Sequence, residues 1–426
     1  SPVLNRDNSS AATSPCPKAW RSLPSHRINS SLPGTLAFQT IRGESGVDFI
    51  GTDGVDILLS LNETGNETVD ALGGNDNITL EDSSGVVGSA TVKGGAGNDT
   101  ITIGGPTNQG VTRLFDSSIN GGAGNDAITT DGAQTATLRG NEGQDVFTLN
   151  GNYTSSVING NAGGDVFNIL AGGALQLQDS KIVGGNDNDG NINLSQGAIT
   201  AVNSTINGNK GNDIITIGGA GLTATVSEFT IFGGAGNDTI NNNNAVVNGT
   251  IVYSGDKGND TINAGAGSDT MDLGAGNDSV ITSAGADRIT GGAGVDTINL
   301  LAAGNTNKFI YTTITDLTFG TTAAAGERDA LVIGAGTGGA IQTFNTAPIA
   351  LGVNATFADY LDAATTAIGN AGSNGDVGWF QFSGNTYLVQ DNSSEATFDV
   401  ASGDIVVELL GLQDLSTMVT TDGGIS

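Results

Sequence analysis

Aspartates recur at a fixed distance from glycines in this chain, a combination suited to binding a hard metal ion. Between residues 255 and 300 they follow one another every nine residues. Glycine permits positive φ, so a glycine-rich turn brings several carbonyl oxygens close to one point, and the aspartate adds a carboxylate oxygen. Calcium takes six to eight oxygen ligands, which two stacked turns can supply and one cannot. We therefore predict calcium sites at Asp260, Asp269, Asp278, Asp287 and Asp296.

The same glycine turn recurs upstream with a longer period. GGAGNDTI stands at 94–101 and again at 233–240, and steps between aspartates run from 19 to 27 residues. Because each longer coil has one such turn, we predict a single calcium row through Asp76, Asp99, Asp126, Asp145, Asp165, Asp187, Asp213, Asp238 and Asp260. The glycines expected to shape the sites are Gly94, Gly95, Gly97, Gly121, Gly122, Gly124, Gly233, Gly234, Gly236, Gly258, Gly265, Gly267, Gly274, Gly276, Gly292 and Gly294.

Short strands must position these turns. An apolar residue stands two places after each aspartate, for example Ile262, Met271 and Val280, and is expected to point inward. A polar–apolar alternation such as DSSINGG (116–122) precedes the upstream turns and predicts a half-buried strand. Each upstream coil therefore has two strands, with a calcium-free loop opposite. In 255–300 two nine-residue halves form one coil, with coils about 4.8 Å apart and calcium rows on both edges.

Composition narrows the classes of function. Lys and Arg number 14 and Asp and Glu 44, which gives a formal net charge of −30. Such a surface repels nucleic acid and anionic membranes and attracts cations. A single cysteine, Cys16, excludes an intrachain disulfide, and one histidine, His26, is too few for a Cys₂His₂ zinc site. The chain contains no run of 18 apolar residues, so the sequence predicts no transmembrane helix.

Stacking so many carboxylates has an energetic consequence. Two unit charges about 5 Å apart repel by roughly 1 kcal/mol at the dielectric constant of water and by about 3–4 kcal/mol at an effective value near 20. Summed along a row of aspartates, this repulsion exceeds the usual net stability of a domain, about 5–15 kcal/mol. We therefore predict that the repeats are unfolded without calcium and fold on binding it.

The nonapeptide G-G-x-G-x-D-x-U-x, in which U is apolar, resembles the repeat of the RTX, or haemolysin-type calcium-binding, family. The match covers about 43–300 and is weaker at 282–290, where Ser283 or Ala284 replaces the first glycine. The resemblance implies an all-β, right-handed parallel β-roll or β-helix with calcium between one turn and the turn a full coil later. The implied pairs are Asp260 with Asp278, Asp269 with Asp287, and Asp278 with Asp296.

The repeats divide the chain. Residues 1–42 hold five of the seven prolines and are expected to be a disordered arm, a linker or a remnant. Residues 43–254 are predicted to form the one-row helix, 255–300 the two-row roll, and 301–426 a β-rich C-terminal cap. The stretch 384–416 is similar to sequences that precede the C-terminal signal of RTX proteins, which type I exporters of Gram-negative bacteria recognise.

The leading functional hypothesis is a secreted, calcium-binding structural protein of the bacterial cell surface. Its composition resembles RTX-type S-layer proteins, which implies self-association into a lattice or matrix, with cell-surface polysaccharide as a further partner and no enzymatic activity. One alternative is the C-terminal RTX portion of a secreted protease, lipase or epimerase. Another is a calcium-dependent adhesin or carbohydrate-binding module that stacks Trp379, Phe380, Phe382 and Tyr387 on sugar. No residue is assigned a catalytic role, because every candidate aspartate has a calcium role.

Overall fold

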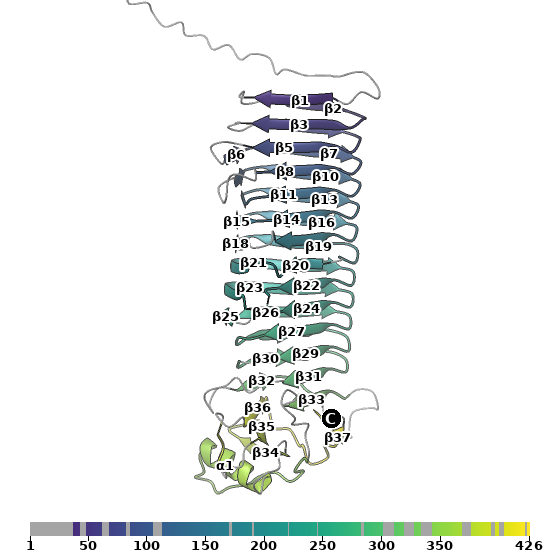
Figure 1. Ribbon diagram of the computed structural model, residues 1–426. Helices are drawn as coiled ribbons and strands as arrows, with labels where there is room; N and C mark the ends of the chain where they lie inside the picture. The colour runs from purple at the N-terminus through teal and green to yellow at the C-terminus, as the bar shows by residue number, and fades with distance from the viewer. Residues whose placement is uncertain are drawn as a thin grey trace, which may run out of the picture.

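The structure is a computed structural model. It describes residues 37–42, 48–61, 68–81, 86–104, 113–169, 173–189, 191–219, 221–244, 246–282, 285–300, 311–318, 328–333, 343–368, 376–392, 397–399, 404–421 and 424–426. Most of these residues form one long coil of parallel strands stacked along a single axis (Figure 1). The predicted all-β parallel architecture is therefore confirmed.

One sheet, here called sheet 1, contains the strands that follow the glycine turns. Its neighbours pair in parallel register, for example Thr100 with Ala127 and Ser279 with Thr297. Its parallel strands are β1 (Ala37–Arg42), β3 (Asp56–Leu61), β5 (Asn77–Glu81), β8 (Thr100–Ile103), β11 (Ala127–Thr130), β14 (Val146–Leu149), β17 (Val166–Ile169), β20 (Asn191–Leu194), β22 (Ile214–Ile217), β24 (Thr239–Asn242), β27 (Thr261–Gly265), β29 (Ser279–Thr282), β31 (Thr297–Leu300) and β33 (Ala330–Ile333).

The second sheet, sheet 2, contains the strands that precede the glycine turns. They are β2 (Asp48–Thr52), β4 (Thr68–Leu72), β7 (Thr91–Ala96), β10 (Ser118–Ala123), β13 (Thr137–Glu142), β16 (Val157–Ala162), β19 (Lys181–Gly185), β21 (Ala198–Lys210), β23 (Thr223–Ala235), β26 (Ile251–Lys257), β28 (Thr270–Asp272), β30 (Arg288–Thr290) and β32 (Thr312–Ile314).

The side opposite the glycine turns is more ordered than the predicted loop. Short strands pair there from coil to coil, namely β6 (Val86–Gly88), β9 (Arg113–Phe115), β12 (Ala133–Gln134), β15 (Gly151–Thr154), β18 (Ala174–Gln178) and β25 (Val246–Asn248). In β21 and β23 such a strand continues directly into the sheet 2 strand, which gives two strands of 13 residues.

The core is a narrow column of apolar side chains between the two sheets. Ile101, Ile128 and Phe147 occupy equivalent positions in successive coils and are fully buried. The ring of Phe147 stacks on that of Phe167 one coil later, with centroids 4.8 Å apart. The apolar residue two places after each aspartate is thus the core residue, as the sequence pattern predicts.

The ends of the coil differ from the sequence expectation in one respect. Residues 37–42, expected to belong to the N-terminal arm, instead form β1, which pairs in parallel with β3 and adds one strand to the stack. Residues 1–36 lie outside the described residues.

The C-terminal elements form an antiparallel sheet beside a helix. The sheet consists of β34 (Asp376–Phe382), β35 (Asn385–Asp391) and β36 (Ile405–Leu409), and β36 joins the last coil by pairing in parallel with β32. Helix α1 (Phe357–Ile368) packs near β34. Antiparallel β37 (Thr420–Thr421) and β38 (Gly424–Ile425) extend sheet 1.

The aromatic residues proposed as a sugar platform are mostly part of this C-terminal core. Trp379, Phe380 and Tyr387 are all buried. The rings of Phe380 and Tyr387 stack on each other with centroids 5.3 Å apart. Their faces are therefore already occupied by protein rather than free to stack on a sugar.

Candidate calcium sites along one edge of the coil

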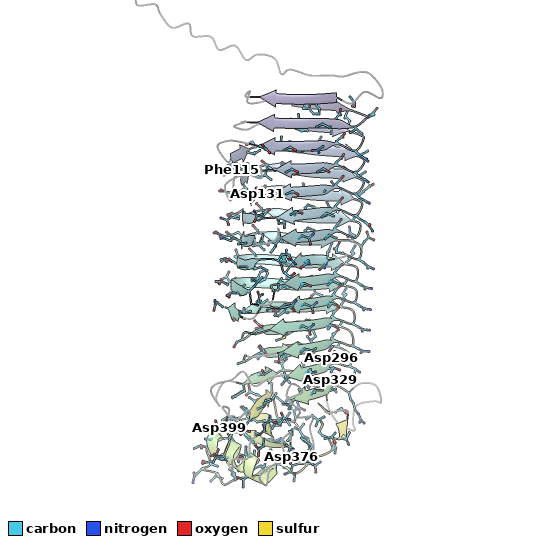
Figure 2. The ribbon with its side chains drawn as sticks, in the orientation of Figure 1. Phe115, Asp131, Asp296, Asp329, Asp376 and Asp399 are labelled. Carbon is cyan, nitrogen blue, oxygen red and sulfur yellow. The ribbon has the colours of Figure 1, made fainter. Side chains whose placement is uncertain are left out.

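A column of aspartates runs along the edge where sheet 2 turns into sheet 1. The backbone N–H of each aspartate donates a hydrogen bond to Oδ1 of the aspartate one coil later, as Asp76 does to Asp99 (2.8 Å) and Asp260 to Asp278 (2.7 Å). This column, here called the aspartate edge, contains Asp56, Asp76, Asp99, Asp126, Asp145, Asp165, Asp189, Asp213, Asp238, Asp260, Asp278, Asp296 and Asp329. Figure 2 shows its last members, Asp296 and Asp329.

The second carboxylate oxygen distinguishes the interior of this column from its ends. At the ends, Oδ2 of Asp56 accepts a hydrogen bond from Thr52 N–H, and Oδ2 of Asp329 accepts one from Thr318 N–H, both at 2.6 Å. In the interior, Oδ2 is buried and has no hydrogen-bond partner at Asp76, Asp99, Asp126, Asp145, Asp165, Asp189, Asp213, Asp238, Asp260 and Asp278. A buried carboxylate oxygen without a hydrogen-bond donor is costly unless a positive charge faces it, so each of these positions suits a bound cation.

Backbone carbonyls converge on the same points. A Cβ atom built on Gly94 would lie 2.2 Å from Oδ2 of Asp99 and 2.4 Å from the carbonyl oxygen of Gly121, one coil later. Equivalent oxygens surround Gly160 and Gly208. Glycine is required at this position because any side chain would displace the oxygens. Each turn thus brings a carboxylate oxygen and a carbonyl oxygen of the next coil together.

A second ladder flanks the first and runs in the opposite direction. Where asparagine precedes the aspartate, its Oδ1 accepts a hydrogen bond from the following coil, as Asn75 Oδ1 does from Asn98 N–H and Asn98 Oδ1 from Asn125 N–H, both at 2.8 Å. The Asn–Asp dipeptide therefore joins each turn to the coil before it and the coil after it, which fixes the vertical spacing of the oxygens.

Burial perturbs the acidity of these carboxyl groups. Loss of hydration raises the pKa of Asp126 and Asp213 to about 7 and that of Asp145 to about 6, and a backbone N–H bond to each group opposes the rise. The pKa of Asp189 is raised to about 8, because the charges of Asp213, Asp165 and Asp187 add to its burial. The metal-free edge therefore favours protons, and a bound cation would take their place.

The donors fit calcium. Within the ranges that the structure describes, no three His, Cys, Asp or Glu side chains form a ready-made metal cluster. Each site would instead combine carboxylate oxygen from the aspartate edge with backbone carbonyls of adjoining turns. Calcium accepts both oxygen types in flexible geometry, whereas zinc favours nitrogen and sulfur.

Comparison with known families agrees with this geometry. A family model described as RTX calcium-binding nonapeptide repeat (4 copies) matches residues 84–102, 114–134, 201–221, 230–244, 252–280 and 274–305. The chain therefore contains RTX calcium-binding repeats. No curated protein matches it.

The RTX geometry extends beyond the matched segments. Residues 135–200 lie between two of them, yet Asp145, Asp165 and Asp189 continue the aspartate edge there without a break. Their turns read GNEGQD, GNAGGD and GGNDND. Asn141 and Asn161 adopt the positive φ of the second glycine, at 84° and 79°, which explains how the turn persists without it.

A second RTX row lies on the opposite edge, in the nonapeptide region. Ile251 N–H donates to Oδ1 of Asp269 (2.9 Å), Asp269 N–H to Oδ1 of Asp287 (3.0 Å), and Asp287 N–H to Oγ1 of Thr312 (3.3 Å). Oδ2 of Asp269 is buried and unpaired. The predicted alignment of Asp269 with Asp287 is confirmed, although Ser283 and Ala284 lie outside the described residues.

One predicted member of the first row is wrong. Asp189, not Asp187, continues the aspartate edge, because Asp165 N–H donates to Asp189 Oδ1 (3.1 Å) and Asp189 N–H to Asp213 Oδ1 (2.8 Å). Asp187 occupies the fourth position of the turn, where the other RTX turns have glycine, and is exposed. Its Oδ2 accepts a hydrogen bond from Gly163 N–H (3.0 Å).

Two further aspartates were missed. Asp56 lies in GTDGVD, a recognisable but degenerate turn before the predicted start of the row. Asp329 lies in ERDALVI, where only the apolar residue two places later could have indicated it. Both are buried and join the ladder through Asp76 and Asp296.

A serine ladder occupies the edge opposite the aspartates in the upstream coils. It consists of Ser117, Ser156, Ser180 and Ser204, which are all buried; we call it the serine edge. Ser156 N–H donates to Ser180 Oγ and Ser180 N–H to Ser204 Oγ, both at 3.1 Å. Each hydroxyl also donates to the carbonyl two residues earlier, as Ser180 does to Gln178 (2.8 Å). Pairing of Ser204 with Phe229, and of Phe229 with Ile251, places this edge in line with Asp269.

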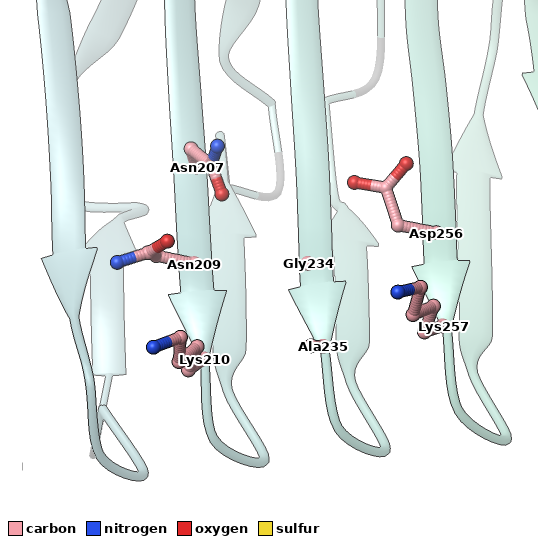
Figure 3. Close-up of a pocket in the computed structure, with 7 residues that line it drawn as sticks. All are labelled: Asn207, Asn209, Lys210, Gly234, Ala235, Asp256 and Lys257. Atoms are coloured by element: carbon pink, nitrogen blue, oxygen red, sulfur yellow. The ribbon is translucent and has the colours of Figure 1, made fainter.

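A shallow depression of about 440 Å³ lies on sheet 2. Gly234 and Ala235 form its floor between the longer side chains of Asn209, Lys210, Asp256 and Lys257 (Figure 3). Two lysines and one aspartate line it, a mixed-charge arrangement unlike the carbonyl-rich turns of the aspartate edge. The depression arises because a coil with small side chains at this point lies between two coils with longer side chains.

Proposed function

We propose that the chain is a structural component of the bacterial cell surface, of S-layer or matrix type, that folds and assembles when it binds calcium. Calcium binding itself follows from the RTX repeats. The observation that carries the structural role is the extent of the aspartate edge, which runs from Asp56 to Asp329 and so occupies nearly the whole coil.

Secretion is consistent with this role. RTX repeats are typical of secreted proteins, and no helix in the described ranges is long and apolar enough to cross a membrane. Sites with an extracellular type of affinity, weaker than about 10⁻⁴ M, stay empty at cytosolic calcium levels. We propose export by a type I system that recognises a C-terminal signal, so that the chain reaches the outside unfolded and folds there.

We also propose that the chain has no catalytic activity. The buried aspartates are aligned in columns one coil apart, and their oxygens face carbonyls of neighbouring turns rather than an open cleft. This geometry serves to hold coils together around cations. A stiff rod of this kind suits a coat or a matrix.

Electron microscopy of the purified chain tests the proposal. In millimolar calcium we expect sheets, a lattice or bundled rods, and in EGTA we expect neither rods nor assemblies. Monodisperse single rods at high protein concentration in calcium would contradict the structural role while leaving calcium binding intact.

A further inference from the structure

The outward face of sheet 1 is uncharged over most of the coil. The first and third residues of the twelve strands from β5 to β33 face away from the core, and none of them is Asp, Glu, Lys or Arg. Sixteen are threonine or asparagine, such as Thr148, Asn193 and Thr216. Val146 and Ile214 are 39% and 43% exposed within this face. In a chain with a net charge of −30, this is a marked segregation of charge.

Sheet 2 has the opposite character. Its outward residues include Asp70, Lys93, Arg139, Lys181, Asp272 and Arg288. Lys93 and Asp70 form an ion pair at 3.5 Å. Charged side chains of this kind keep a sheet surface solvated and discourage association, and the sheet 1 face from β5 to β33 has only Glu81, at the end of β5.

We infer that the outward face of sheet 1 is the surface through which one copy of this chain binds a second copy. This inference rests on the proposed assembly and names the face that carries it. Two copies with a net charge of −30 each repel one another, and the repulsion is smallest where uncharged faces meet. A basic partner would bind the acidic surfaces instead, because the outward face of sheet 1 offers it a single strand carboxylate from β5 onward, that of Glu81 at the end of β5.

The area of the sheet 1 face and its regular strand spacing support a second copy as the occupant. Twelve strands about 4.8 Å apart, each about 13 Å long, give a face of roughly 750 Å² per copy, against about 800 Å² per partner in a standard stable interface. Two such faces share the same strand spacing, so their threonine and asparagine rows can interdigitate along their whole length. A two-fold axis would make the contact self-complementary.

A matched pair of substitutions tests this face. Asn193 lies on β20, in the middle of sheet 1, and its Oδ1 accepts from Ser195 N–H (3.1 Å). Asn159 lies on β16 of sheet 2, and its Oδ1 accepts from Asn161 N–H (3.0 Å). Asn193→Asp and Asn159→Asp keep the same acceptor and each add one charge, but to opposite faces. Thr216→Asp, one coil from Asn193, is a second sheet 1 variant.

The measurement is sedimentation velocity of the full chain in calcium over a range of concentrations, with circular dichroism to establish folding. We expect Asn193→Asp and Thr216→Asp to weaken self-association at least tenfold and Asn159→Asp to leave it within twofold. If the wild type associates and all three variants associate equally well, the sheet 1 inference is wrong and the proposed assembly stands. If the wild type stays monomeric, both are wrong. Monomers that bind a neutral polysaccharide through sheet 1 would also overturn the inference.

Discussion

The two edges of the upstream coils join successive turns through the same kind of hydrogen bond. They differ in whether the side chain that accepts this bond has a further polar atom without a partner. On both edges a backbone N–H donates to a side-chain oxygen one coil later, as Asp189 N–H does to Asp213 and Ser180 N–H to Ser204. A serine hydroxyl then donates to a nearby carbonyl and is satisfied. A carboxylate keeps a buried oxygen without a partner. We therefore expect calcium dependence to reside in the aspartate edge, because the serine edge stacks its turns without an unpaired charged oxygen.

The largest expected effect is that of calcium removal. When the carboxyl groups are ionised, the unpaired Oδ2 atoms and converging carbonyls concentrate negative charge along the aspartate edge. We expect the resulting repulsion to exceed the stability that the serine edge and the core supply. We expect EGTA to abolish the β signal in circular dichroism and millimolar calcium to restore it. A β signal that survives in EGTA at pH 8 would show that the serine edge and the core keep the coil folded without calcium, which contradicts this prediction.

Acidity should replace calcium in part. Burial raises the folded-state pKa of Asp165, Asp213 and Asp260 to about 7, against about 3.9 in an unfolded chain. A raised pKa means that the folded, metal-free chain binds more protons, so its stability is greatest below about pH 4 and is lost as pH rises through about 7. We expect the metal-stripped chain to regain β signal as pH falls from 8 to 5.

The same shift predicts that less calcium is needed at higher pH, because the ion no longer competes with protons. Calcium titrations at pH 6 and pH 8 measure this. A midpoint that is equal at both values, or lower at pH 6, would mean that the buried carboxyls are not the ligands.

A pair of substitutions in neighbouring coils separates the contribution of the aspartate edge from that of the serine edge. Asp213→Asn keeps the acceptor for Asp189 N–H and removes a charged oxygen, so we expect fewer bound ions and a smaller gain in unfolding free energy per decade of calcium. Ser204→Ala leaves Ser180 N–H without its partner, at a cost of about 1–3 kcal/mol, and should leave that calcium slope unchanged. Urea unfolding at several calcium concentrations gives both quantities.

A smaller difference in calcium affinity is expected between substitutions of Asp189 and Asp187, which lie in the same turn. Asp189→Asn should raise the calcium midpoint several-fold, because Asp189 is buried with an unpaired Oδ2. Asp187→Asn should change it less than twofold, because Asp187 is exposed and its Oδ2 already accepts from Gly163 N–H. Isothermal titration calorimetry resolves the two, and the reverse order would restore Asp187 to the row.

The turns could be predicted from sequence wherever the glycines are intact, because glycine, aspartate and the apolar residue then fix one another's positions. Asp187 and Asp189 are two residues apart and point to the same side of an extended chain, so only the register of whole coils distinguishes them. Asp329 has Glu327 at the position two residues before it, where the other turns of the aspartate edge have glycine or, before Asp189, Asp187. The serine edge depends on hydrogen bonds between residues 20 to 27 positions apart, and a serine before a strand has no distinctive local signal.

Crystals grown in calcium test the central claim most directly, because anomalous scattering locates each ion. The account predicts ions between successive turns along the aspartate edge, further ions beside Asp269 and Asp287, and none between Ser117 and Ser204 on the serine edge. Ions on both edges of the upstream coils, or an aspartate edge without them, would contradict it.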